Sequence, residues 1–187
     1  MRQLTLVLAL AVATVVAGAC SQTPTAPEFT VPLSVNSVKT GEPLSSTHLK
    51  GENEVPARET QAQGQAIMKV SEDGRSISYK LIASNIDNVI AAHIHVGSAT
   101  VAGPVVVFLY GTAPSGAGRH DGILSEGTFT AANFVGPLAG QPFAALLAQM
   151  AAGNTYVNVH TNDGVAPTNT GPGDFPGGEI RGQIIKK

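Results

Sequence analysis

Three histidines in strand-like segments have the type and spacing that could bind a metal ion in this 187-residue chain. His93 and His95 flank a single isoleucine, and residues two apart on a β-strand point to the same face. His160 ends the segment YVNVH, in which polar residues alternate with two valines. If these two strands are neighbours in the sheet, the three imidazoles converge into a ligand set that suits zinc or copper.

A structural role for the same histidines is the alternative, because any half-exposed strand alternates polar and apolar residues. The isoleucine and valines of both segments belong in the core, so we expect the imidazoles on an outer or mouth-facing side of the β structure. Imidazoles in such positions also serve as hydrogen-bond partners for loop backbone. His48 and His120 lie in less regular surroundings and are left out of the predicted ligand set.

Charged residues near the C-terminal end form a second group with candidate roles. In GGEIRGQI, Glu179 and Arg181 share one face of a strand. Arg181 beside a carboxylate such as Glu179 or Glu54 predicts a structural ion pair, with anion binding as the alternative. Glu52 and Glu54 are placed on one face of an edge strand, where pairing with a cation is favoured over acid–base chemistry. Asn158, Arg181 and Glu179 are therefore predicted to support the histidines or to bind an anion.

Short β-branched segments separated by Gly, Asn, Asp or Pro must position these residues, and they predict an all-β domain. An Asp-Gly pair at 73–74 predicts a hairpin between the first two clear strands. Residues 142–152 instead carry apolar residues at helical spacing, which predicts one short helix over an opening of the β structure. About eight strands are expected, near 48–54, 65–70, 76–83, 89–96, 105–110, 123–130, 156–161 and 179–185.

The composition of the chain argues against several classes of function. Eleven Lys and Arg stand against 13 Asp and Glu, for a net charge of −2, so we expect no nucleic-acid partner. The single cysteine excludes an internal disulfide framework and a zinc site built from several cysteines. No nucleophile elbow, Walker loop, dinucleotide fingerprint or Cys–His pair is found in the sequence, which favours a non-catalytic protein.

The first twenty residues have the pattern of an export signal, with Arg2 ahead of an apolar core over residues 4–16. This core is shorter than the ~20 residues that a transmembrane helix needs. Small residues then precede Cys20, and the arrangement resembles a bacterial lipoprotein box. The resemblance implies cleavage ahead of Cys20 and acylation of that residue. A simple secretory signal with an unrelated cysteine nearby is the alternative.

These features divide the chain into three parts and predict its location. Residues 1–19 are a predicted lipoprotein signal peptide, residues 20–43 a lipidated N-terminus with a flexible tether, and residues 44–187 the folded domain. We therefore expect an extracytoplasmic protein of the cell envelope, at the outer membrane or facing the periplasm. The membrane is its expected partner, through the lipid anchor.

The folded part contains five sequence blocks, LKGENEVP (49–56), AAHIHVG (91–97), AGPVVVFLY (102–110), GNTYVNVHT (153–161) and PGGEIRGQI (176–184). Together they resemble the chordin-type CHRD domain, in an order and spacing that make the resemblance specific. It implies that residues 44–187 are a CHRD domain with an immunoglobulin-like β-sandwich, but it implies no reaction, because the family's molecular activity is poorly defined. In many members the His-Thr block runs directly into the Gly-Gly-Glu block, whereas here the loop 162–175 intervenes.

Two functions follow from these patterns. The first is a lipid-anchored, non-catalytic envelope module that binds a protein, a glycan or a metal ion. The second is a copper- or zinc-binding protein with superoxide-dismutase-like redox activity, on an immunoglobulin-like or superoxide-dismutase-like sandwich. Paired strand histidines, a later strand histidine and a late arginine are similar to copper–zinc superoxide dismutase, in which such histidines hold copper and an arginine steers the anion. The bridging histidine, the zinc loop and the disulfide cysteines of that enzyme are missing from this sequence.

Overall fold

A computed structural model of the protein describes residues 43–185, so the predicted signal peptide, Cys20 and nearly all of the predicted tether lie outside the described residues. Within this range the chain has eight strands and a single α-helix, α1 (Phe143–Ala151), which confirms the predicted all-β fold with one short helix. None of the described helices is long and apolar enough to cross a membrane. The strands are β1 (Pro43–Lys50), β2 (Gln63–Val70), β3 (Ser76–Asp87), β4 (Val89–Val96), β5 (Val105–Tyr110), β6 (Arg119–Thr130), β7 (Thr155–Thr161) and β8 (Ile180–Gln183).

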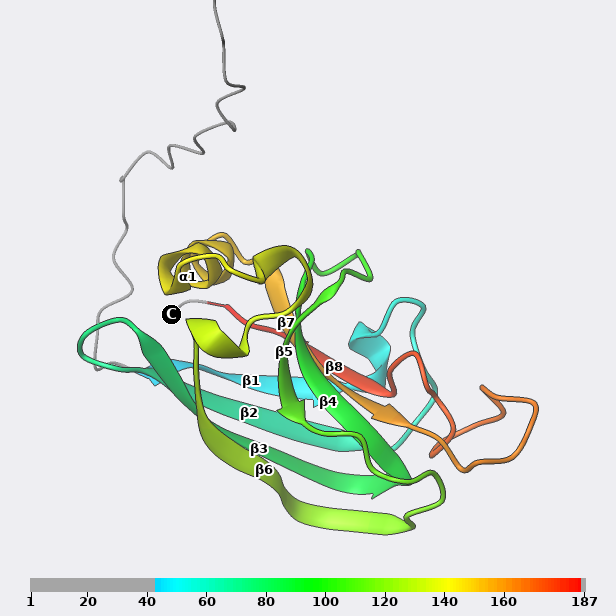
Figure 1. The fold of residues 1–187 in the computed structure, drawn as a ribbon. Helices are drawn as coiled ribbons and strands as arrows, with labels where there is room; N and C mark the ends of the chain where they lie inside the picture. Colours follow the sequence, from blue (N-terminus) through cyan, green and yellow to red (C-terminus); the bar gives the residue numbers. More distant parts are fainter. Residues whose placement is uncertain (1–42, 186–187) are drawn as a thin grey trace, which may run out of the picture. The chain divides into compact units, whose positions relative to one another are not determined.

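The eight strands form one antiparallel sheet in the order β5-β4-β7-β8-β1-β2-β3-β6. Figure 1 shows that this sheet folds over on itself, with β1, β2, β3 and β6 in one wall and β4, β5, β7 and β8 in the other. The two walls join where β1 meets β8, at the pair Lys50 and Arg181. The two layers expected of a sandwich are therefore two halves of one continuous sheet.

Side chains close the gap between the two edge strands, β5 and β6. The backbone carbonyl of Leu109 on β5 accepts hydrogen bonds from the hydroxyls of Tyr79 (2.7 Å) and Ser125 (2.6 Å) on the opposite wall. Just beyond β6, the backbone N–H of Val135 donates to the carbonyl of Val106 on β5 (3.0 Å). The sheet is thus nearly closed, and neither edge is free along its whole length.

The core lies between the two walls and is capped by α1. Ile94 on β4 and Val157 and Val159 on β7 are fully buried, as their alternation with polar residues predicts. The helix buries Phe143, Leu146 and Met150. The ring of Phe143 stacks on Phe134, with centroids 5.6 Å apart, so the helix seals one end of the sheet.

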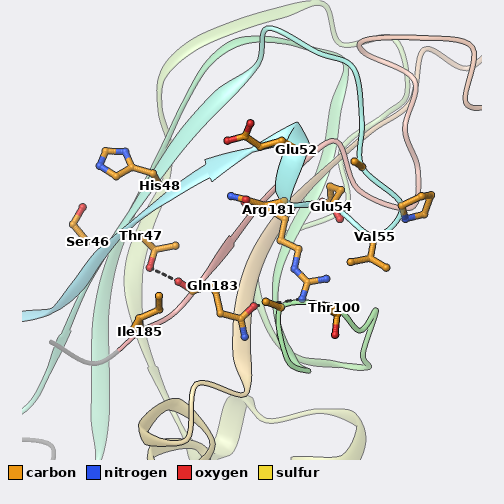
Figure 2. Close-up of a pocket in the computed structure, with 14 residues that line it drawn as sticks. Ser46, Thr47, His48, Glu52, Glu54, Val55, Thr100, Arg181, Gln183 and Ile185 are labelled. Carbon is orange, nitrogen blue, oxygen red and sulfur yellow. Dashed lines mark hydrogen bonds between the residues drawn. The ribbon is translucent and has the colours of Figure 1, made fainter.

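The chain turns sharply after β1, which corrects the predicted placement of two glutamates on one strand face. Residues Gly51–Asn53 form a 3₁₀ turn, η1, and the Gly51 carbonyl accepts hydrogen bonds from the N–H groups of Glu54 (3.0 Å) and Arg58 (2.9 Å). Glu52 consequently stays exposed and pairs with Lys50 at 3.1 Å, whereas Glu54 is only 7% exposed. Figure 2 shows the two carboxyl groups well separated, so the acid–base pair considered from the sequence does not form.

Candidate metal centre

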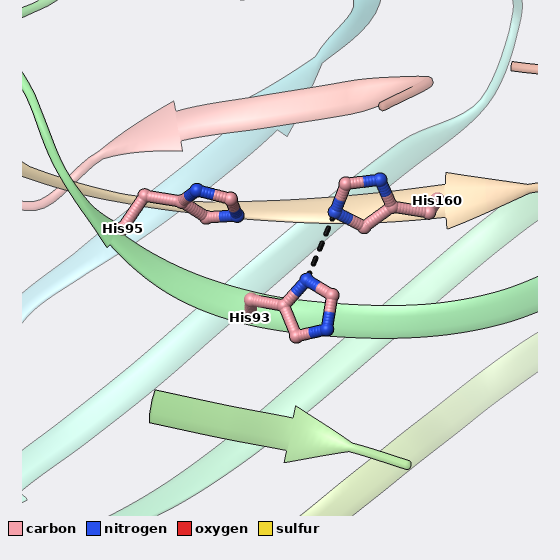
Figure 3. Close-up of side chains that lie close together, drawn as sticks. All are labelled: His93, His95 and His160. Atoms are coloured by element: carbon pink, nitrogen blue, oxygen red, sulfur yellow. Dashed lines mark hydrogen bonds between the residues drawn. The ribbon is translucent and has the colours of Figure 1, made fainter. Parts of the chain in front are cut away.

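The histidines His93, His95 and His160 come together because β4 and β7 are neighbours in the sheet. In the antiparallel register His93 lies opposite Asn158 and His95 opposite Tyr156, which puts His160 on the same side of the sheet. Each of the three imidazoles offers one nitrogen, and these nitrogens all lie within 4.8 Å of one another. Figure 3 shows the three rings turned toward a common centre.

Backbone carbonyls orient two of the three rings. Nδ1 of His95 lies 2.8 Å from the Gly103 carbonyl oxygen, and Nδ1 of His160 lies 2.9 Å from that of Pro176. A carbonyl oxygen can only accept, so both Nδ1 atoms carry the proton and both Nε2 atoms carry a lone pair. Histidines that bind metal ions almost always donate their other N–H to such a partner.

The remaining hydrogen bonds of the cluster do not satisfy all of its nitrogens. Nδ1 of His93 lies 3.0 Å from Nε2 of His160, and the tautomer of His160 makes His93 the donor when no ion is bound. Within the described residues, the Nε2 atoms of His93 and His95 are buried and have no hydrogen-bond partner. A purely structural role therefore leaves the lone pair of His95 without a donor, and buried polar atoms without partners are rare.

The cluster is more enclosed than the sequence predicts. The imidazoles do lie opposite the core valines, but His93, His95 and His160 are only 9%, 7% and 8% exposed. The segments after β4 and β7 fold back over this side and supply the two carbonyls, while the half-exposed ring of Phe108 meets His93 edge-on at 4.6 Å. The histidines thus lie on the outer side of the sheet, as expected, but loops cover them and shield them from solvent.

Burial keeps the three imidazoles neutral. Burial, together with the neighbouring imidazoles, lowers the pKa of His93 from 6.5 to about 4. The same two causes lower the pKa of His160 to about 4, against the hydrogen bond to the Pro176 carbonyl, which raises it. The pKa of His95 is also lowered by burial, although the Gly103 carbonyl and the Asn158 side chain oppose the shift. Neutral imidazole is the form that binds a metal ion, so the cluster needs no deprotonation at neutral pH.

Arg181 holds the loop that orients His95 and does not form the predicted ion pair. Its guanidinium donates to the carbonyls of Ser98 (2.7 Å) and Val101 (3.2 Å) in the segment between β4 and β5. It also lies 3.4 Å from the ring centroid of Tyr156, on which His95 stacks at 4.8 Å. The ion pairs of the described chain are elsewhere, at Lys50–Glu52, Lys80–Glu126 and Arg119–Asp121.

Glu179 anchors the second covering loop. Its carboxylate accepts hydrogen bonds from the hydroxyls of Thr60 (2.6 Å) and Thr161 (2.7 Å) and from the N–H of Gly173 (2.8 Å), and the residue is 0% exposed. These contacts tie β7 to the segment that carries Pro176. Glu179 therefore acts on His160 through the loop and is not itself in the cluster.

An open pocket of about 870 Å³ lies beside η1 and is lined by Arg181, Gln183, His48 and Glu54, among others (Figure 2). Burial raises the pKa of Glu54 to about 7, against the opposing charges of Arg181 and Arg58. Glu54 was considered from the sequence as an ion-pair partner, whereas the two orienting carbonyls and Phe108 were not predicted as parts of a site. Contacts to backbone carbonyls depend on loop paths, which leave no local pattern in a sequence.

The fold and the site define the class of the protein: an all-β domain, a single sheet closed nearly into a barrel, with three buried histidines gathered on the outer side of one wall. The family model of the CHRD domain matches residues 45–184. The chain therefore belongs to the CHRD domain family, as its sequence blocks indicate. No curated protein and no solved structure matches the chain.

Proposed function

We propose that the protein is a non-catalytic metal-binding module that holds one copper or zinc ion between His93, His95 and His160. The observation that carries the proposal is the convergence of three neutral, buried imidazole nitrogens within 4.8 Å, two of them on rings fixed by backbone carbonyls. Imidazole is a good ligand for both ions.

The geometry of the cluster is compatible with an ion at its centre. Zn–N bonds of about 2.0–2.1 Å at a tetrahedral angle separate two nitrogens by about 3.3 Å. Nδ1 of His93 and Nε2 of His160 are already 3.0 Å apart. The two ligand nitrogens that lie farthest apart are at most 4.8 Å from each other, and rotation of a side chain would bring them to the distance that a bound ion requires.

Binding alone is proposed, and not superoxide-dismutase-like redox activity. The arginine expected to steer an anion, Arg181, is 1% exposed and donates to the carbonyls of Ser98 and Val101. Its guanidinium is thus engaged in holding a loop. An anion approaching the cluster would have to displace these hydrogen bonds.

Metal content tests the proposal directly. We expect the full-length chain, purified in detergent, to carry close to one copper or zinc ion by elemental analysis. The double variant His93→Ala, His95→Ala should lose that ion, and His48→Ala, which removes an exposed histidine outside the cluster, should keep it. A wild-type protein that neither contains these ions nor takes them up at micromolar concentration would overturn the proposal.

We further propose that the module is anchored by lipid at Cys20 and works outside the cytoplasm. The support is the export signal ahead of the cysteine, and several acyl chains hold a protein to a membrane far more firmly than one does. We expect Cys20→Ala to move the protein from the detergent phase to the aqueous phase when cells are extracted with a phase-separating detergent. An unchanged distribution would show that this cysteine carries no anchor.

A further inference from the structure

The three-histidine cluster brings together no negative charge, and this has a consequence for the ion that it selects. We propose that the site prefers monovalent copper, Cu(I), to the divalent ions Zn(II) and Cu(II). This inference rests on the proposed function and specifies its ligand.

The number of ligands fits Cu(I). Among the residues that the structure describes, the cluster comprises three histidines and contains no cysteine, aspartate or glutamate. Three imidazoles can complete the coordination of Cu(I). A zinc ion with three protein ligands retains a fourth position for water, which requires space and solvation inside a site that is less than 10% exposed at each histidine.

The charges around the cluster also favour the monovalent ion. The buried acids Glu54, Asp174 and Glu179 all lie outside the cluster, and Glu179 is occupied by its three hydrogen-bond donors. A cation also lies near the cluster, because the guanidinium of Arg181 and the ring of His95 both stack on the ring of Tyr156. The free energy needed to move an ion out of water rises with the square of its charge. The desolvation cost at this buried site is therefore far larger for a divalent ion than for a monovalent one.

Asn158 is the position where a divalent-metal site would be expected to carry a carboxylate. It lies on β7 in the same row as Tyr156 and His160, opposite His93, and is 2% exposed. Its side chain lies between His95 and the buried carboxyl group of Glu54, and a hydrogen bond from it acts on the pKa of each. A neutral amide here means that no carboxylate stands in the row of the ligands, so Asn158 is a residue that determines metal specificity.

Competition titrations of the full-length protein test the selectivity. Cu(I) is supplied anaerobically with a reductant and a chromophoric Cu(I) chelator, and Zn(II) and Cu(II) are titrated separately against their own chelators. We expect Cu(I) to bind at one equivalent and at least about 100-fold more tightly than Zn(II). Equal or tighter binding of Zn(II) or Cu(II) would overturn this inference and leave the proposed metal site standing. Failure of all three ions to bind would overturn both.

The variant Asn158→Asp tests the role of charge with almost no change of shape. We expect it to raise the affinity for Zn(II) about 10- to 100-fold, and that for Cu(I) only by about the square root of this factor, because the attraction scales with the ion's charge. Asn133→Asp is the matched control, since Asn133 is exposed and keeps its acceptor role toward Thr130. An equal gain for both ions, or none in a variant whose circular dichroism shows it folded, would contradict the inference.

Discussion

Replacement of His160 by glutamine is expected to weaken binding of the metal ion by about 10²–10³-fold. Structural zinc sites with four ligands contribute about 10–16 kcal/mol, or roughly 2.5–4 kcal/mol per ligand, and each 1.4 kcal/mol is about tenfold in affinity. Glutamine preserves polarity and much of the volume but offers no imidazole nitrogen. His160 is also the ring whose Nε2 meets His93 and whose Nδ1 meets the Pro176 carbonyl, so its replacement removes both of these contacts together with the ligand nitrogen.

The measurement is a competition titration of His160→Gln beside His48→Gln, with thermal unfolding of both in the presence and absence of the ion. A ligand at about 1,000 times its Kd stabilises the folded state by about 4 kcal/mol, and this stabilisation should disappear in His160→Gln. His48 is exposed and outside the cluster, so its replacement should leave both affinity and stabilisation unchanged. If the two variants bind the ion equally well, His160 is not a ligand and its role is structural.

Strand periodicity predicted which histidines would share a face, but not that they would meet. The positions of His93 and His95 follow from the two-residue repeat of one strand, whichever strand lies beside it. Their approach to His160 depends on the pairing of β4 with β7, and a pairing between distant segments has no local signal in the sequence. The structure supplies this step.

The burial of the three histidines could not be predicted from the sequence of their own strands, because it also depends on distant segments. All seven residues of β7 are buried, although its sequence alternates like that of a half-exposed strand. The polar side is covered by segments after β4 and β7, and their paths are fixed by contacts from Arg181 and Glu179 to backbone groups. These two residues were singled out from the sequence, but with carboxylate or anion partners in mind.

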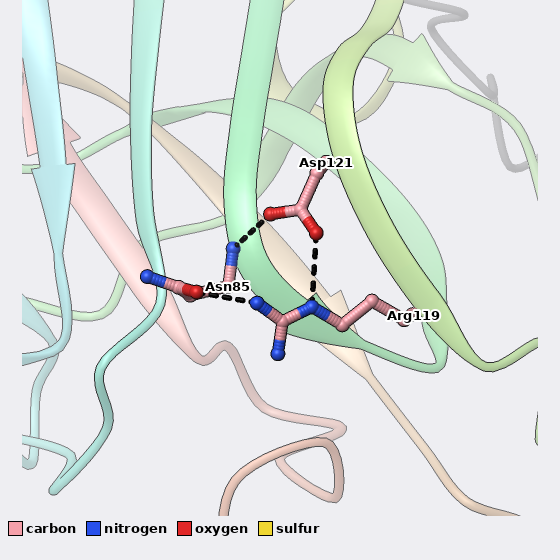
Figure 4. Close-up of polar contacts among 3 residues, drawn as sticks. All are labelled: Asn85, Arg119 and Asp121. Atoms are coloured by element: carbon pink, nitrogen blue, oxygen red, sulfur yellow. Dashed lines mark hydrogen bonds and ion pairs between the residues drawn. The ribbon is translucent and has the colours of Figure 1, made fainter.

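Strand ends were predicted least well where the backbone departs from regular pairing. β3 continues to Asp87, past the predicted end at residue 83, because the ladder to β6 resumes after an irregularity at Asn85. Asn85 has a φ of 54°, and its N–H donates to the Asp121 carboxylate at 2.7 Å. Figure 4 shows Arg119 completing the contact by donating to both Asp121 and Asn85. Such a bulge requires partners from another strand, so β3 alone does not reveal it.

Replacement of Glu179 by alanine is expected to lower the free energy of unfolding by about 3–5 kcal/mol, the largest stability effect among the residues around the site. The carboxylate is 0% exposed, and its removal leaves the hydroxyls of Thr60 and Thr161 and the N–H of Gly173 without their acceptor. Each buried donor left unpaired costs about 1–3 kcal/mol. Glu179→Gln keeps one carbonyl oxygen and should lose less.

Denaturant unfolding of the ion-free protein measures this loss, with Glu126→Ala as the control. Glu126 pairs with Lys80 at 3.2 Å on the surface, where its side chain is 59% exposed, so its removal should change stability by no more than about 1 kcal/mol. Because Glu179 fixes the segment that carries Pro176, the alanine variant should also bind the metal ion about 10–100-fold more weakly, as loss of an outer partner does. A variant that loses stability but keeps full metal affinity would show that the loop held by Glu179 does not position His160 for metal binding. An unfolding free energy within about 1 kcal/mol of wild type would mean that these three hydrogen bonds do not hold the loop.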